Sequence, residues 1–115
     1  MAYTLNRNER LRGRNAFRRV FRSGRQTSCR GLKLLFRENE TGITRCAFVC
    51  SKALGNAVQR NREKRVARET YRLRKNRIEA GYDLVFILFP GGRGTRDRAE
   101  QFDRLLRDAS LIKQT

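Results

Sequence analysis

Apolar residues along the chain repeat with two different periods, and these periods divide the chain into predicted helices and strands. A helical period over residues 14–22, followed by Gly24, predicts a short helix. Alternation over residues 31–38 and 43–51, with turn residues at 39–42 between them, predicts an antiparallel hairpin. The first half of the chain is therefore predicted to form one helix and then two paired strands.

The second half is predicted to be one buried strand between two helices. Residues 82–89 (YDLVFILF) are the most continuous apolar run and are stopped by a Pro-Gly-Gly sequence. Helical periodicity covers the stretch 55–77 before this run and the stretch 95–109 after it. The apolar stripe of the last helix consists of Ala99, Phe102, Leu105, Leu106 and Ala109. The pattern predicts an α+β fold, a two-layer α/β sandwich in one domain spanning residues 1–115, with residues 1–10 loosely ordered.

The two strands of the predicted hairpin each have one apolar face and one mixed face. The apolar face is formed by Leu32, Leu34, Phe36, Cys46, Phe48 and Cys50. The opposite face combines apolar, basic and hydroxyl side chains: Lys33, Leu35, Arg37, Arg45, Ala47, Val49 and Ser51. This division is typical of an antiparallel sheet that packs on a core with one face and meets solvent with the other.

The charge of the chain is concentrated in the predicted long helix and in the first thirty residues. The net charge is +17, and residues 60–77 alone hold nine Lys or Arg against two Glu. The first thirty residues add nine basic residues and one acidic residue. Such a density of like charge indicates a polyanionic partner, because the charges repel one another in the free protein.

On a helical projection the basic residues of the long helix gather on one side. An arc of about 140° contains Arg60, Asn61, Lys64, Arg65, Arg68 and Arg72, while Val66, Ala67, Thr70 and Leu73 occupy another arc. Guanidinium groups suit phosphates because their planar donors bind two oxygens at once. A solvated helix surface is the alternative, but such surfaces usually interleave acids with the basic residues.

Two phenylalanines of the short N-terminal helix, Phe17 and Phe21, have two possible roles. They could be core residues, or they could stay partly exposed and stack on unpaired bases beside Arg18.

The sequence does not predict a catalytic centre within this chain. It contains no His, and the helix-borne acids Glu63 and Glu69 lie among arginines as expected ion partners. Cys46 and Cys50 are four residues apart in a strand, roughly 13 Å, which is too far for one zinc ion or a disulfide. Neither an export signal nor an apolar segment of membrane-spanning length is seen, so we expect a cytoplasmic protein with free thiols.

The ordered series around the basic helix resembles the signature of the bacterial ribonuclease P protein subunit. The series consists of Ser51-Lys52, Gly55-Asn56-Ala57-Val58, Arg60-Asn61-Arg62, Lys64-Arg65, Arg68-Glu69 and Arg72. The resemblance covers nearly the whole chain, and Leu11, Phe17, Val20, Phe21 and Gly24 also fit the family pattern.

The resemblance implies a function, a partner and two sets of contact residues. The chain would assist an RNA-based endonuclease that removes the 5′ leader of precursor tRNA, with no active site of its own and Mg²⁺ held by the RNA subunit. It would be monomeric without RNA. Contacts to the catalytic RNA would come from Lys52, Arg60, Asn61, Arg62, Lys64, Arg65, Arg68 and Arg72. The leader would contact Phe17, Arg18, Phe21, Lys33, Leu35 and Ser51.

The resemblance also carries expectations about the fold and shows two departures from the family. It implies the order α-β-β-β-α-β-α with a left-handed strand–helix–strand crossover, whereas the general default is right-handed. The family often has an aromatic residue near Leu35, and it usually has two lysines where this chain has Lys52-Ala53. Arg45 or Arg30 could replace the missing lysine.

Two other classes of protein remain open from the residues alone. A ribosomal or other structural RNA-binding protein would use the same basic helix with no link to catalysis. A DNA-binding regulator would place the helix in a major groove, but no dimer seam or helix-turn-helix unit is visible in the sequence.

Overall fold

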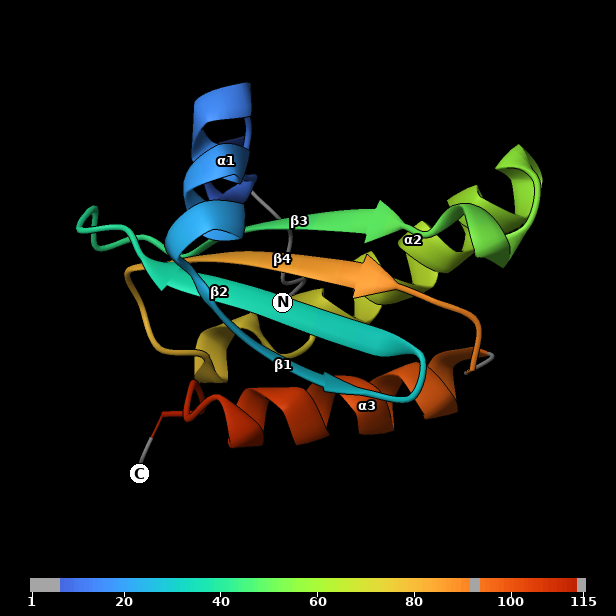
Figure 1. The fold of residues 1–115 in the computed structure, drawn as a ribbon. Helices are drawn as coiled ribbons and strands as arrows, with labels where there is room; N and C mark the ends of the chain where they lie inside the picture. Colours follow the sequence, from blue (N-terminus) through green and yellow to red (C-terminus); the bar gives the residue numbers. More distant parts are fainter. Residues whose placement is uncertain (1–6, 92–93, 114–115) are drawn as a thin grey trace.

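The computed structural model describes residues 7–91 and 94–113, which form one sheet with helices on both faces (Figure 1). Residues 92 and 93 lie outside the described part, as do residues 1–6 of the stretch 1–10 that was predicted to be loosely ordered. The elements in chain order are η1 (Arg7–Glu9), α1 (Arg14–Ser23), β1 (Arg25–Cys29), β2 (Leu32–Glu38), β3 (Arg45–Cys50), η2 (Lys52–Leu54), α2 (Ala57–Arg72), η3 (Lys75–Arg77), β4 (Tyr82–Leu88) and α3 (Gly94–Asp108).

The strand order is β1-β2-β4-β3, so the predicted hairpin between residues 31–38 and 43–51 is wrong. β4 lies between β2 and β3, antiparallel to β2 and parallel to β3. The physical reason is the apolar sequence of β4, whose residues 83–86 and 88 are buried. A strand with two apolar faces is most stable in the centre of a sheet, where both faces are covered and both edges are hydrogen-bonded.

β1 is a strand that the residue pattern did not locate. It pairs antiparallel with β2 through a turn at Arg30 and Gly31, where Gly31 has φ +88°. Its sequence RQTSC is polar and its burial is low, as expected for an edge strand with no core of its own. With β1 included, the observed order of helices and strands is the order that the family resemblance implies.

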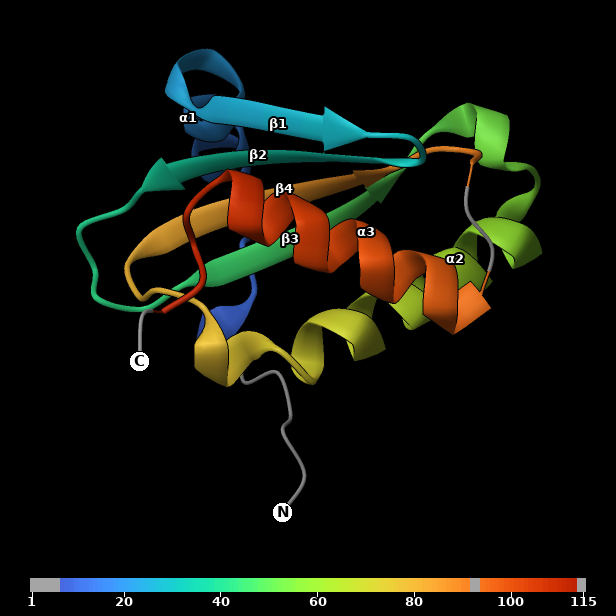
Figure 2. The ribbon, with the colours of Figure 1, turned by 90° about the horizontal axis from the view of Figure 1, so that it is seen from below.

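The crossover from β3 through α2 to β4 is left-handed. In Figure 1 both strands run in the same direction, β3 lies above β4, and the 90° turn in Figure 2 shows that α2 lies behind the sheet. When both strands point upward, β4 is to the right of β3 with the helix behind, which is the left-handed arrangement. The expectation from the resemblance is confirmed, and the general right-handed default does not apply.

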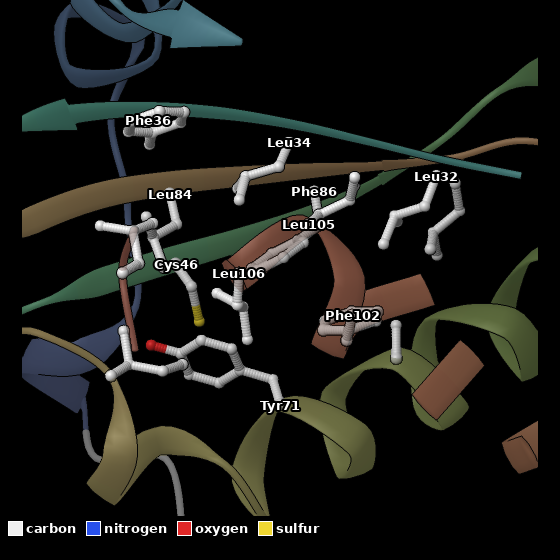
Figure 3. Close-up of a cluster of buried hydrophobic side chains, with 14 residues drawn as sticks. Leu32, Leu34, Phe36, Cys46, Tyr71, Leu84, Phe86, Phe102, Leu105 and Leu106 are labelled. Carbon is white, nitrogen blue, oxygen red and sulfur yellow. The ribbon is translucent and has the colours of Figure 1, made fainter. Parts of the chain in front are cut away.

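Helices cover both faces of the sheet, and each face has its own apolar cluster. α1 lies on one face, while α2 and α3 lie together on the other (Figure 2). Under α1 the buried residues are Leu11, Ala16, Val20, Leu35 and Val85. The larger cluster under α2 and α3 includes Leu32, Leu34, Phe36, Cys46, Tyr71, Leu84, Phe86, Phe102, Leu105 and Leu106 (Figure 3). The predicted apolar face of the strands is confirmed as the face toward α2 and α3.

The larger core is organised around the ring of Phe86 on the central strand. Phe102 of α3 stacks on it with centroids 4.5 Å apart, and Tyr71 of α2 meets it edge-on at 5.8 Å. Phe48 of β3 stacks from the side at 5.6 Å. Aromatic pairs at these separations add stabilisation beyond burial of their area. One ring thus joins both helices to the middle of the sheet.

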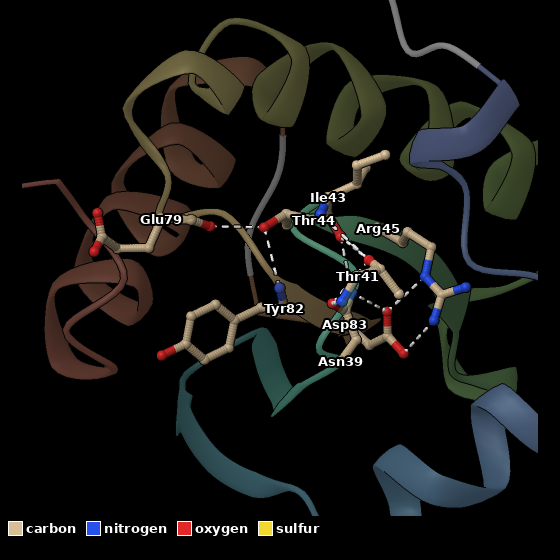
Figure 4. Close-up of polar contacts among 8 residues, drawn as sticks. All are labelled: Asn39, Thr41, Ile43, Thr44, Arg45, Glu79, Tyr82 and Asp83. Carbon is tan, nitrogen blue, oxygen red and sulfur yellow. Dashed lines mark hydrogen bonds and ion pairs between the residues drawn. The ribbon is translucent and has the colours of Figure 1, made fainter.

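The loop between β2 and β3 crosses the end of β4 and is fixed there by a buried carboxylate (Figure 4). Asp83 accepts hydrogen bonds from Arg45 Nε and Nη2, both at 2.8 Å, and from Asn39 Nδ2 at 2.9 Å. Thr44 Oγ1 also donates to the Glu79 carbonyl at 2.6 Å. The sequence predicted that β2 and β3 pair directly. Instead, these bonds attach the loop between them to β4 and to the residues before it.

The guanidinium of Arg98 is fully buried and connects α3 to three other elements. It donates to Glu63 Oε1 of α2 at 2.9 Å and to the Gly31 carbonyl of the β1–β2 turn at 2.7 Å. Further bonds reach Gln101 Oε1 at 2.8 Å and the Phe89 carbonyl at 3.3 Å. A buried cation is tolerated only when it is paired and hydrogen-bonded, and here both conditions are met.

Removing Glu63 should therefore destabilise the protein strongly. Glu63→Ala leaves the Arg98 charge buried without its partner, and we expect a loss of about 3 kcal/mol in the free energy of unfolding. Urea denaturation at fixed salt measures this loss.

Glu100→Ala is the matched control, because it removes the same charge from an exposed i,i+4 pair with Arg96. It should cost less than about 1 kcal/mol. Equal losses in the two variants would contradict the role given to the Glu63–Arg98 pair.

Candidate nucleic-acid interface

The basic helix α2 begins with a capping box that its sequence encodes. Asn56 Oδ1 accepts from the Gln59 amide at 2.9 Å, and Gln59 Oε1 accepts from the Asn56 amide at 2.9 Å. Gly55 precedes the cap at φ +120°, and a Cβ at this position would collide with the Gln59 side chain. The turn before α2 therefore requires glycine, and the first turn of the helix is held in a fixed orientation.

The solvent side of α2 is basic, as the sequence predicts. Asn61, Arg62, Arg65 and Arg68 are exposed, whereas Arg60, Lys64 and Arg72 are half-buried. The core side contains Ala67, Thr70 and Tyr71. The predicted apolar arc is thus shifted by part of a turn, since Tyr71 is buried while Leu73, at the end of the helix, is 51% exposed.

Most basic residues of α2 are not neutralised by acids. Within the described ranges, Arg60, Arg62, Lys64, Arg65 and Arg68 make no ion pair. The two acids of α2 are both engaged, as the sequence predicts: Glu63 with Arg98, and Glu69 with Arg72. The hydrogen bond from Arg72 lowers the pKa of Glu69 below its usual value. The unpaired cations form a surface that suits phosphates.

The N-terminal segment brings two further arginines to this surface, which sequence reasoning did not locate. Arg10 forms a bridge with Cys46 of β3, and the Leu11 amide donates to the Cys46 carbonyl at 2.9 Å. A hollow of about 220 Å³ results, lined by Arg10 and Arg12 on one side and by Lys64 and Arg68 on the other. The high charge of the first thirty residues was the available signal.

Burial keeps the three thiols of the chain protonated at neutral pH. Burial raises the pKa of Cys46 to about 12, and burial also raises the pKa of Cys29 and Cys50. All three are free, and the part of the chain that is described contains no group of three or more residues that could hold a metal ion. No helix in these ranges has the length and apolar character to cross a membrane.

The opposite face of the sheet presents a second candidate surface beside α1. Phe21 is 50% exposed and Phe17 is half-buried. Neither ring is fully buried in the core, so both are accessible for the second of the two predicted roles, stacking on unpaired bases. Arg18 is exposed on the outer side of α1. A separate hollow of about 700 Å³ lies at the β1 edge; it is lined by Phe21 and Leu35 and also by Asp108, Ala109 and Ser110 at the end of α3.

Strand register defines the floor of this second surface. Lys33, Ile87 and Val49 are opposite one another on β2, β4 and β3, and all three are half-buried; we call them the open row. The neighbouring row contains Leu35 and Val85, which α1 covers. Leu35 is 6% exposed, so in the free protein it supports α1. Ile87 was not predicted as a surface residue, because its apolar strand was expected to be wholly buried.

Several sequence-predicted contact residues lie at the end of the sheet where β3 leads into α2. Lys52 is exposed in η2, and Ser51 accepts a hydrogen bond from the Ala53 amide at 3.2 Å as the cap of η2. Of the two candidates to replace a lysine at Ala53, Arg45 lies at the start of β3, far from Ala53, and is bound to Asp83. Arg30 and Ala53 line the same hollow.

These features define a small α+β protein with an unpaired basic surface whose chemistry suits nucleic acid. A sequence profile of the family described as Ribonuclease P matches residues 5–110. The chain belongs to the ribonuclease P protein family. It is therefore an RNA-binding component of a ribonucleoprotein that acts in tRNA processing.

Relatives and solved structures agree with this assignment. The chain is 39% identical to the ribonuclease P protein component of Herpetosiphon aurantiacus, over 93% of this chain and 89% of that protein. It is 36% identical to that of Syntrophus aciditrophicus, over 73% and 71%. The fold is similar to the RNase P protein of Staphylococcus aureus (TM-score 0.79, 27% identity, covering 91% and 98%) and to that of Thermotoga maritima (0.64, 34%, 84% and 82%).

Proposed function

We propose that this chain is the non-catalytic protein subunit of ribonuclease P and binds two RNA segments with two surfaces. The unpaired basic side of α2 docks on the catalytic RNA. The surface beside α1 holds the 5′ leader of precursor tRNA, and the holoenzyme removes that leader to give the mature 5′ end. The observation that carries the proposal is the set of α2 cations without ion-pair partners in the described structure.

Docking of α2 on RNA is supported by charge and by rigidity. Arg62, Arg65 and Arg68 point away from the core and remain uncompensated, so RNA phosphates can replace the counterions that surround them. The capping box and the buried Glu63–Arg98 pair hold the helix in place before RNA arrives. A prearranged surface loses less side-chain and backbone freedom when it binds.

Leader binding is supported by the chemistry of the second surface. Phe17 and Phe21 offer ring faces to unpaired bases, and stacking of this kind tolerates any base sequence. Lys33 in the open row and Arg18 on α1 supply positive charge for the leader backbone. A subunit that binds leader but not mature tRNA raises affinity for the substrate without retaining the product.

Catalysis is assigned to the RNA subunit in this proposal. Hydrolysis would use Mg²⁺ held mainly by that RNA, because the described residues offer no cluster of acids or other ligands suited to a metal ion. The protein would act in the cytoplasm as a monomer until it meets its RNA. Adding the purified chain to the matching RNA at low Mg²⁺ and assaying precursor cleavage tests this assignment, since stimulation is expected and its absence would contradict it.

The docking surface makes a quantitative prediction about salt. Arg65→Ala should weaken binding to the ribonuclease P RNA and lower the slope of log affinity against log salt by about one unit, because one phosphate contact is lost. Fluorescence titrations at several salt concentrations measure the slope.

Arg107→Ala is the control, since Arg107 is an exposed helical arginine of α3. It should leave the slope within error of the parent chain. Equal slopes for Arg65→Ala and Arg107→Ala would argue against docking through α2.

The leader surface makes a prediction about substrate selectivity. Phe21→Ala and Phe17→Ala should weaken holoenzyme binding of precursor tRNA about tenfold, the loss of one stacked base, and leave mature tRNA binding unchanged. Parallel titrations with precursor and mature tRNA give the ratio.

Leu73→Ala is the matched control, because Leu73 has the same exposure as Phe21 but lies at the end of α2. It should change neither affinity. If the phenylalanine variants lowered both affinities equally, the separation into two surfaces would be wrong.

A further inference from the structure

We propose that Arg30, in the turn between β1 and β2, is a phosphate-binding residue that extends the RNA-docking surface beyond α2. Together with Arg62 it would hold the sugar–phosphate backbone of the partner RNA in a groove at the end of the sheet. We call this the end groove; it is lined in part by Arg30, Ala53, Leu54, Gln59 and Arg62. The inference rests on the proposed docking of α2 on RNA.

The end groove is a large, open hollow to which separate parts of the chain contribute. Its volume is about 910 Å³, enough for a length of single nucleic-acid backbone rather than a single ion. The β1–β2 turn supplies Arg30, η2 supplies Ala53 and Leu54, and the first turns of α2 supply Gln59 and Arg62. Figures 1 and 2 show the turn, η2 and the start of α2 at the same end of the molecule.

The backbone of the β1–β2 turn is fixed by hydrogen bonds from two other elements. Gln101 Nε2 of α3 donates to the Arg30 carbonyl at 2.9 Å. The Phe89 amide donates to the Gly31 carbonyl at 3.0 Å, and Arg98 donates to the same oxygen at 2.7 Å. Arg30 is therefore presented from a rigid turn rather than from a loose loop.

The side chain of Arg30 also has a defined path. A Cβ built on Gly91 would lie 2.9 Å from Arg30 Cγ, which shows that the aliphatic part of Arg30 crosses the Gly91 backbone. The stem is thus packed while the residue as a whole remains exposed. This packing limits the rotamers of Arg30 before RNA binds, so less side-chain freedom is lost on binding.

The charges of the end groove favour an anion. Within the described ranges neither Arg30 nor Arg62 makes an ion pair. Two acids also line the hollow: Glu63, which is neutralised by Arg98, and Asp97 at the start of α3. The guanidiniums of Arg30 and Arg62 remain available for phosphate oxygens.

A single buried group fixes the two walls of the groove relative to each other. Arg98 bonds both to Gly31, the neighbour of Arg30, and to Glu63, the neighbour of Arg62. The turn wall and the α2 wall are therefore joined through one guanidinium. RNA that contacts Arg62 on α2 meets Arg30 in a defined position across the groove.

The test measures binding to a transcript of the ribonuclease P RNA from the same organism at several salt concentrations. Arg30→Met keeps the packed stem and removes the charge. It should lower the slope of log affinity against log salt by about one unit, as expected for one lost phosphate contact. Arg30→Lys should retain the slope, because it retains the charge.

A rescue variant tests whether the charge acts in the end groove. Ala53 is exposed and lines the same hollow, so Ala53→Lys in the Arg30→Met background should restore the slope. Arg107→Ala again serves as the control outside the surface. Circular dichroism and urea denaturation confirm that Arg30→Met is folded before its slope is compared.

The outcomes separate this inference from the function on which it rests. A reduced slope for both Arg65→Ala and Arg30→Met supports the inference. A reduced slope for Arg65→Ala with an unchanged slope for Arg30→Met overturns the inference and leaves α2 docking intact. If neither variant changes the slope, the proposed docking surface itself fails.

Discussion

The buried ion pair between Arg98 and Glu63 is the interaction on which the geometry of the proposed RNA-docking surface depends. Arg98 pairs with Glu63, the acid nearest to the start of the basic helix, and the side chain of this acid is only 16% exposed. The outer arginines of α2 then have no acidic neighbour in that turn to compete with RNA. Burying a charge pair contributes little net stability, but separating one is costly. The pair therefore acts chiefly as a constraint on geometry: α2, α3 and the β1–β2 turn cannot move independently while it is intact.

A chain with a net charge of +17 must also limit repulsion among its own basic groups. The structure does this partly by distance, because α1 and α2 lie on opposite faces of the sheet (Figure 2). Acids are used where they hold elements together: Asp83 binds Arg45 at the β2–β3 loop, and Glu9 binds Lys75 near the N-terminal segment. The cations without such partners are left on the surfaces assigned to RNA. Basic residues that are paired with acids thus stabilise the fold, and basic residues without such partners are the ones proposed to bind RNA.

The sequence predicted the elements of this fold better than their pairing. Alternation located β2 and β3, and the apolar run located β4, but proximity along the chain suggested a hairpin where β4 is inserted. The continuous apolar character of β4 was itself a signal for the central position. β1 has a polar sequence and no periodicity, so no residue pattern could reveal it. Arg98 could not be recognised as buried either, because an arginine on an amphipathic helix is normally exposed. On the candidate site, the helical period correctly placed Arg65 and Arg68 on the exposed side of α2, since their direction follows from local geometry alone.

The central position of β4 also explains the character of the surface beside α1. Because β4 lies between β2 and β3, its residue Ile87 occupies the middle of the open row, between Lys33 and Val49. A hairpin of β2 and β3 would have placed Lys33 directly beside Val49 and left no apolar centre. The observed order gives an apolar floor with a charged margin, and Phe17 packs against the same apolar cluster as Ile87 and Val49. Unpaired bases bury their faces on such a floor while their phosphates remain at the charged edge. The position of β4 therefore determines both the strand pairing and the proposed leader surface. Without β4 between β2 and β3, the surface on which the leader is proposed to lie would not exist.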